Sequence, residues 1–201
     1  MVNIRWLGHA CYEIKYGDFT VVIDPYEDGS VPGLGPLRLT ADAVFCSHGH
    51  HDHNFTGAVT LSGRAAPADF AVEEIPCPHD DCGGEKRGMN TARVFHFGAL
   101  RVAHLGDLGE YPSAELLRAL QGVDALLIPI GGFYTIDAAT AKDIVAAAKP
   151  GCVLPMHYRS GRFGFDVLQE LGDFTATAPT PESCVSLPAA GVIPLTPAML
   201  M

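Results

Sequence analysis

His48-Gly49-His50-His51-Asp52-His53 is the most informative run of this sequence, and it comes directly after an apolar segment, residues 43–46. That segment predicts a buried strand, so the histidines lie at a sheet edge, where loops meet and ligands bind. In an extended chain, His48 and His50 project to the same side and can bind one ion together. Imidazole nitrogens and a carboxylate oxygen suit zinc, with iron and manganese as alternatives. Four ligand-type side chains in six positions therefore predict a metal site, and not a polar surface loop.

The part of the chain before this run has the alternation of apolar and polar residues that is typical of strands. We expect strands over residues 1–7, 12–16 and 19–23, with a two-residue turn at Gly17-Asp18. Asp24-Pro25 ends the third strand, and a Gly/Pro-rich loop follows it. Immediately after the histidine run, we expect a short helix from about Asp52 to Leu61.

The second half of the chain alternates predicted strands and helices, with Ser113 and Asp137 as candidate N-caps. The predicted elements are a hairpin over residues 91–97 and 100–105, a helix from Ser113 to Gly122, a strand over 125–130, a helix over 138–149, a strand over 152–154 and a short helix over 165–171. No linker is long enough to divide the chain, so we expect a single domain over residues 1–201. This order predicts an α/β protein in which two mixed β-sheets pack face to face with helices outside.

Composition narrows the choice of partners. The formal net charge is −10, and the 13 basic residues are scattered, so we expect no nucleic-acid partner. The longest apolar stretch, residues 125–130, is far too short to span a membrane. The N-terminus lacks the basic start, apolar run and cleavage site of a signal peptide, which predicts a cytoplasmic protein. The expected partner is therefore a small-molecule substrate, and a homo-oligomer stays open.

Six cysteines could in principle form three disulfides, but a chain of this size builds its own core, and we expect reduced thiols. Cys77 and Cys82 bracket His79, which raises the idea of a cysteine zinc site. Without a second cysteine pair at zinc-finger spacing, this idea is disfavoured.

The sequence resembles the metallo-β-lactamase superfamily, whose His-x-His-x-Asp-His signature it matches at residues 48–53 without a gap. Weaker motifs follow the family's order, namely Gly8-His9-Ala10, Ile23-Asp24-Pro25, Leu105-Gly106-Asp107, residues 129–141 and Pro155-Met156-His157-Tyr158. Within the superfamily, the chain looks most like the small stand-alone hydrolases near ascorbate-6-phosphate lactonase. The resemblance implies an αββα four-layer sandwich.

The resemblance also implies two metal sites that share one ligand. His48 and His50 would bind the first ion together with a third histidine. Asp52, which we also take as a catalytic residue, would bind the second ion with His53 and His157. Asp107 would bridge the two ions, and Asp24 would orient ligands through hydrogen bonds.

Three histidines compete for the third position on the first ion. His104 lies three residues before Asp107 in a predicted strand, where side chains alternate, so the two point to opposite faces. His96 lies inside another predicted strand, where a structural role is ordinary. His79 lies in a loop and matches the family's order of motifs. We predict His79 and keep His96 as the alternative.

Three further residues are candidates for catalysis. The resemblance places His9 and Tyr158 near the site, and Tyr134 follows the Gly131-Gly132 loop. Each could polarise a substrate oxygen or donate a proton to a leaving group. The alternative is that His9 only orients ligands and that both tyrosines only pack.

These observations predict a metal-dependent hydrolase with two zinc ions and a metal-bridging hydroxide. Two divalent ions outweigh the charge of two carboxylates and one hydroxide, which favours a small anionic ester, lactone or phosphoester. The alternatives are a mononuclear iron oxygenase or redox protein on the same fold, a non-catalytic metal-binding protein and, least favoured, a nuclease. A structural zinc site would be closed and cysteine-rich, unlike this one.

Overall fold

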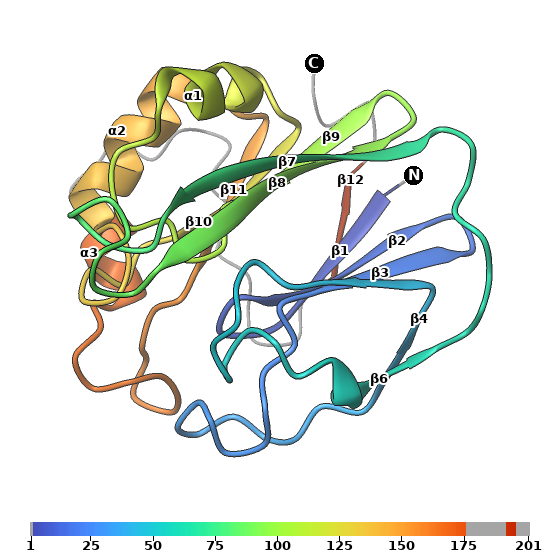
Figure 1. The fold of residues 1–201 in the computed structure, drawn as a ribbon, viewed down its shortest axis with the longest axis horizontal. Helices are drawn as coiled ribbons and strands as arrows, with labels where there is room; N and C mark the ends of the chain where they lie inside the picture. Colours follow the sequence, from blue (N-terminus) through green and yellow to red (C-terminus); the bar gives the residue numbers. More distant parts are fainter. Residues whose placement is uncertain (1, 176–191, 196–201) are drawn as a thin grey trace.

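Two five-stranded sheets pack face to face in the computed structural model, which describes residues 2–175 and 192–195 (Figure 1). The first sheet has the order β12 (Val192–Leu195), β1 (Val2–Gly8), β2 (Cys11–Tyr16), β3 (Phe19–Ile23) and β5 (Ala43–Phe45). The second has the order β11 (Cys152–Met156), β10 (Ala125–Pro129), β9 (Leu100–His104), β8 (Met89–Phe97) and β7 (Phe70–Pro78).

Both sheets contain parallel and antiparallel pairs. In the first, β3 is antiparallel to β2 and parallel to β5. In the second, β10 is parallel to β9 and β11, whereas β8 is antiparallel to β7 and β9. The predicted pair of mixed sheets is confirmed.

The strand sequences follow from the apolar core between the sheets. In β1, the buried Val2, Ile4 and Trp6 alternate with partly exposed residues, as expected for a strand with one face on the core. In contrast, β10 and β11 are buried along their whole length. Their sheet is covered on both faces, by the first sheet and by helices, so every position faces apolar surroundings.

Helices α1 (Ala114–Leu120) and α2 (Ala138–Ala148) cover the outer face of the second sheet, and α3 (Leu171–Thr175) packs against α2 (Figure 1). Both predicted caps are present: Ser113 accepts the N–H of Leu116, and Asp137 accepts the N–H of Thr140. Within the described residues, no helix has the length and apolarity needed to cross a bilayer.

The helix predicted from Asp52 to Leu61 is wrong. The segment forms only a single 3-10 turn, η1 (Thr56–Ala58), and strand β6 (Val59–Leu61), which pairs with β4 (Leu39–Ala41). Gly57 and the β-branched residues around it disfavour a helix, and the N–H of Phe55 instead bonds to the Pro25 carbonyl at 2.7 Å. This small sheet and its loops contribute Ala41 and Ala58 to an apolar cluster with Val22 of β3, so they line the first sheet where a helix was expected.

The helix predicted over residues 165–171 is also wrong, since α3 begins only at Leu171. Gln169 explains the difference: its N–H bonds to the Gly131 carbonyl, and its side-chain oxygen accepts the N–H of Ala138 at the start of α2. These bonds hold the segment in an irregular conformation. The sequence pattern also did not predict β7, which contains two prolines; as an edge strand, β7 tolerates their missing N–H groups. Cys11, Cys46, Cys77 and Cys82 are free cysteines, and Cys184 lies outside the described residues.

Candidate metal centre

The candidate site residues all lie where strands end, at one edge of the sandwich. His9 lies between β1 and β2, and the others follow strands β3, β5, β7, β9, β10 and β11 as Asp24, residues 48–53, His79, Asp107, Tyr134 and His157. The pairing directions explain the convergence: β7, β9, β10 and β11 run the same way, so their carboxyl ends share one edge.

His48, His50 and His79 form the first group of donors, which we call the open cluster because His50 is exposed. The Nδ1 atom of His50 lies 2.9 Å from Nε2 of His48 and 3.2 Å from Nε2 of His79. Two nitrogens on one tetrahedral zinc, each at about 2.0–2.1 Å, are about 3.3 Å apart. The spacing of these nitrogens therefore suits a single zinc ion.

His9, Asp52, His53 and His157 form the second group, which we call the buried cluster. Asp52 Oδ2 lies 3.1 Å from His9 Nε2 and 3.7 Å from His53 Nε2. Three of the four residues are buried, and Asp52 is partly exposed. The structure thus brings together the three residues predicted for the second ion and adds His9 as a fourth donor.

Asp107 lies between the two clusters. Its carboxylate is within 4 Å of four imidazole nitrogens, at 3.1 Å from His157, 3.3 Å from His53, 3.3 Å from His79 and 3.9 Å from His48. This is the position that a carboxylate bridging two ions requires.

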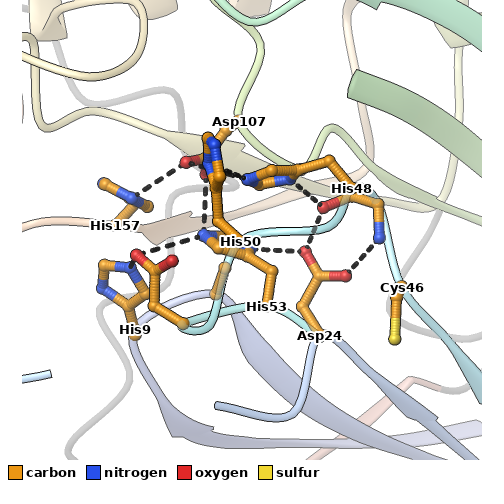
Figure 2. Close-up of polar contacts among 12 residues, drawn as sticks. His9, Asp24, Cys46, His48, His50, His53, Asp107 and His157 are labelled. Atoms are coloured by element: carbon orange, nitrogen blue, oxygen red, sulfur yellow. Dashed lines mark hydrogen bonds and ion pairs between the residues drawn. The ribbon is translucent and has the colours of Figure 1, made fainter. Parts of the chain in front are cut away.

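Asp24 determines which nitrogen of His53 is available to a metal. The fully buried carboxylate accepts hydrogen bonds from the Ser47 N–H and hydroxyl, both at 2.6 Å, and from His53 Nδ1 at 2.8 Å. Figure 2 shows His53 between Asp24 on one side and Asp107 on the other. Because Nδ1 is engaged, Nε2 faces the site. Burial alone would raise the pKa of Asp24, but the hydrogen bond from His53 holds it below the usual value.

The surroundings lower the pKa of some histidines of the site and raise that of another. Burial lowers the pKa of His48 to about 3 and that of His9 to about 4, so both rings are neutral and have a free lone pair at neutral pH. Burial also opposes the charged form of His53, but the carboxylates of Asp107 and Asp24 raise its pKa. A cation that binds between these groups takes the place of that proton.

Two buried atoms support a metal directly. In the part of the chain that the structure describes, His53 Nε2 and Asp107 Oδ1 are buried without a hydrogen-bond partner. The two atoms face each other as an ion pair at 3.3 Å without a hydrogen bond, and buried polar atoms are nearly always hydrogen-bonded, so the pair favours a bound group. A divalent ion satisfies both, and the surrounding nitrogen and oxygen donors suit zinc.

Backbone strain concentrates at the same place. Among the described residues, only four non-glycine residues have positive φ, and three of them are His9 at 53°, Asp24 at 48° and His157 at 53°. Side chains other than glycine avoid this region, and strained residues cluster at functional sites. The strain aims these three side chains into the centre.

The remaining predicted residues differ in their surroundings. The Tyr134 ring lies 6.3 Å from the His157 ring and is half-buried. The buried Tyr158 ring instead stacks on Trp6 at 5.6 Å. His104 contacts the Ala10 carbonyl and the Gly106 N–H, and neither it nor His96 belongs to a donor cluster among the described residues. Of the three competing histidines, only His79 lies with the other donors.

The sequence pattern did not single out Asn90, which supports the bridging position. This buried residue accepts the Asp107 N–H at 3.0 Å and donates to the Leu105 carbonyl at 2.8 Å. No local signal marks it, because its partners lie 15 and 17 residues away.

Comparisons with known proteins identify the family of this chain. A model of the beta-lactamase superfamily domain matches residues 3–157. A UPF0173 protein of Pyrococcus abyssi is 31% identical over 194 residues, covering 81% of this chain and 85% of that protein. A UPF0173 metal-dependent hydrolase of Thermococcus onnurineus is 28% identical over 193 residues, covering 80% of this chain and 86% of that protein.

A solved structure from Thermotoga maritima, described as a candidate Zn-dependent hydrolase of the metallo-β-lactamase superfamily, superposes with a TM-score of 0.66 and 25% identity. The match covers 90% of this chain and 87% of that one. The superfamily and the metal-dependent hydrolase group that the signature at residues 48–53 predicted are therefore confirmed: the chain belongs to the metallo-β-lactamase superfamily, among its stand-alone UPF0173 metal-dependent hydrolases.

Proposed function

We propose that this protein is a di-zinc hydrolase that cleaves a small, negatively charged ester, lactone or phosphoester. The observation that carries the proposal is the convergence of two donor clusters on one carboxylate, with orphaned nitrogen and oxygen atoms between them. Manganese or iron would fit the same donors, so the choice of zinc rests on ligand type and spacing. The finer resemblance to ascorbate-6-phosphate lactonase stays a prediction.

In this proposal the open cluster would hold the first ion, Asp52, His53 and His157 would hold the second, and Asp107 would be a ligand to both. Two divalent ions would supply a water of lowered pKa and polarise the oxygen of the scissile group. The protein's own side chains orient the ligands. Asp24 fixes the His53 ring, and Asn90 fixes the backbone at Asp107.

His9 and Tyr134 have distinct proposed roles. His9 is neutral, and its Nε2 lies 3.1 Å from Asp52 Oδ2, so its N–H donates a hydrogen bond that orients this carboxylate. Tyr134 lies beside His157 with its side chain partly exposed, so its hydroxyl can donate a proton to a leaving group. Tyr158 is the second candidate donor, although its ring packs against Trp6.

We further propose a cytoplasmic enzyme that acts on a small molecule, with nucleic acid excluded by its acidic balance. Retention of donors for two ions argues against a mononuclear iron oxygenase, and the exposed His50 argues against a closed structural site.

The test is removal and replacement of the metal. The protein is stripped with a chelator, reloaded with zinc or with iron, and assayed under nitrogen and in air with 4-nitrophenyl esters, phosphorylated lactones and phosphodiesters. We expect about two zinc equivalents and oxygen-independent hydrolysis by the zinc form. Activity confined to the iron form in air would move the protein into the redox class. A zinc content near zero after reloading would reject the metal centre itself.

A further inference from the structure

A pocket of about 550 Å³ opens beside the metal centre. That volume is typical of small-molecule sites. Its walls come from three loops, within residues 80–87, 109–111 and 132–137, and from Thr140 and Asp143 of α2. Each loop follows a strand that carries part of the centre: Asp80 follows His79, and Gly109 lies two residues after Asp107. Tyr134 belongs both to the pocket wall and to the surroundings of His157, 6.3 Å away between ring centroids. Tyr134 thus links the pocket to the metal centre, close enough for one small substrate to reach both.

Arg87 is the distinctive side chain of this pocket. Its guanidinium carbon lies 5.9 Å from the Phe133 ring centroid and 5.5 Å from the Tyr134 ring centroid. Within the described residues, it forms no ion pair, whereas its neighbour Lys86 is paired with Asp81 at 2.9 Å. A half-buried guanidinium against two aromatic rings and without a carboxylate partner can receive an external oxyanion.

Asp80 fixes the backbone of the loop that carries Arg87. Its buried carboxylate accepts the N–H groups of Cys82 and Gly84 on one oxygen and those of Lys86 and Arg87 on the other. The loop is therefore folded around one side chain before any ligand arrives. A preorganised cation loses less conformational freedom on binding than one on a mobile loop.

Most of the acidic side chains of the pocket already have hydrogen-bond or ion-pair partners in the protein. Asp80 is satisfied by backbone N–H groups, Asp81 by Lys86, and Asp137 by the N-terminus of α2. Glu110 and Asp143 remain at the wall and would favour a cation. Binding of an anion by Arg87 and binding of a cation by Glu110 and Asp143 require substrates of opposite charge. The charge that the enzyme prefers therefore tests which side chains bind the substrate.

We propose that Arg87 is a specificity-determining residue, whose guanidinium binds a carboxylate or phosphate group on the part of the substrate remote from the scissile bond. The proposal rests on the hydrolase function above. Phe133 and Tyr134 flank the guanidinium and provide apolar surface for the carbon chain that links this anion to the reacting group.

The experiment uses the zinc-loaded protein and four activated esters that differ in the far end of the acyl chain. The 4-nitrophenyl esters of hydrogen succinate and 3-phosphonopropanoate carry the two oxyanions. The ester of 4-methylpentanoate is their neutral shape match, and that of 4-(trimethylammonio)butanoate is cationic. We compare Arg87→Gln and Arg87→Lys with Arg118→Gln, which makes the same substitution at an exposed position of α1 outside the pocket wall. Thermal unfolding verifies that each variant is folded.

We expect Arg87→Gln to lower kcat/KM at least about tenfold for the anionic ester that is preferred, mainly through KM, and to leave the neutral ester within about twofold. Arg87→Lys should recover part of the preference, and Arg118→Gln should keep all of it. The preferred oxyanion distinguishes a carboxylate from a phosphate. Equal losses on anionic and neutral esters, or a preference for the cationic ester, would overturn the proposal.

A second measurement does not depend on turnover. Calorimetric titration of succinate and of 3-phosphonopropanoate into the same zinc-loaded proteins should give a Kd that is at least about tenfold weaker in Arg87→Gln for the preferred anion. An unchanged Kd would reject Arg87 as the anion site. If no ester is hydrolysed by the native protein but the Kd shift is present, the proposed hydrolysis of esters fails and the Arg87 site stands.

Discussion

The two donor clusters differ in how much of the protein holds them. In the buried cluster, Asp24 accepts a hydrogen bond from His53, and the His9 carbonyl accepts both the Trp6 indole N–H and the His157 N–H. In the open cluster, His50 is exposed, and its side-chain bonds within the described residues go only to His48 and His79. The buried cluster is preorganised by its surroundings, whereas in the open cluster Ser47 supports His48 but the exposed His50 has only its two fellow members. We therefore expect the buried cluster to bind its ion more tightly.

His53→Ala should have the largest effect, because His53 belongs to the buried cluster and also to a second donor group with His48 and Asp107. We expect loss of both zinc ions and a fall in kcat/KM of at least about 1,000-fold, or about 4 kcal/mol at 1.36 kcal/mol for each factor of ten. His50→Ala is the matched variant and should lose one ion only. Elemental analysis after gel filtration measures both contents. Equal metal loss from the two variants would show that the clusters do not differ.

Asp24→Asn tests the support of the buried cluster without touching a ligand. An amide offers one acceptor where the carboxylate now receives three hydrogen bonds, so the His53 ring loses its fixed orientation. We expect the Kd of the tighter zinc ion to rise about 10- to 100-fold, as measured by chelator competition.

Ser47→Ala is the control for this change, because Ser47 also contacts His48 Nδ1 at 2.9 Å while the bond between His53 and Asp24 is kept. It should weaken the tighter ion less than Asp24→Asn does. The reverse order would mean that Ser47, and not Asp24, supports the buried cluster.

The same contrast explains what the sequence predicted and what it did not. The run from His48 to His53 is a local pattern after a buried strand, so a candidate metal site could be proposed there without a structure. The conformation after it was not, because Phe55 bonds to the distant Pro25 and β6 pairs with β4. We predicted a helix there, but Gly57 and its β-branched neighbours disfavour one, and the pairing of β6 with β4 makes a strand instead.

The residues that orient the candidate ligands were the hardest to predict from the sequence. The motif around Asp24 predicted an orienting role, but no spacing rule connects Asn90 to Asp107 or folds residues 80–87 around Asp80. The position of His9 in the buried cluster depends on a backbone φ of 53° at the turn between β1 and β2. Contacts of this kind depend on how strands far apart in the chain align.

Gly109→Ala disturbs the open cluster through the backbone. A Cβ at position 109 would lie 2.0 Å from the Asp80 backbone nitrogen, so the loop that carries His79 must move. We expect a loss of about 1–3 kcal/mol in the free energy of unfolding and weaker binding of the less tightly held zinc. Gly49→Ala makes the same change between two ligands, where nothing lies within 4 Å of the new Cβ, and it should be nearly neutral. Normal zinc binding by Gly109→Ala would show that the open cluster tolerates displacement of His79.

Tyr158→Phe should have the smallest effect. Its ring stacks on Trp6 at an interplanar angle of 18° and packs edge-on against Phe163, and phenylalanine keeps both contacts. Burial raises the pKa of the Tyr158 hydroxyl to about 12, so the group stays protonated over the whole working range. We therefore expect kcat within about twofold of the native value, whereas Tyr134→Phe should lower kcat by about 100-fold if its hydroxyl protonates the leaving group. Substrates with leaving groups of increasing acidity separate the two roles further: the loss in Tyr134→Phe should shrink as the leaving group needs less protonation, and that in Tyr158→Phe should stay flat. A large loss in Tyr158→Phe that follows leaving-group acidity would assign proton donation to the buried tyrosine instead.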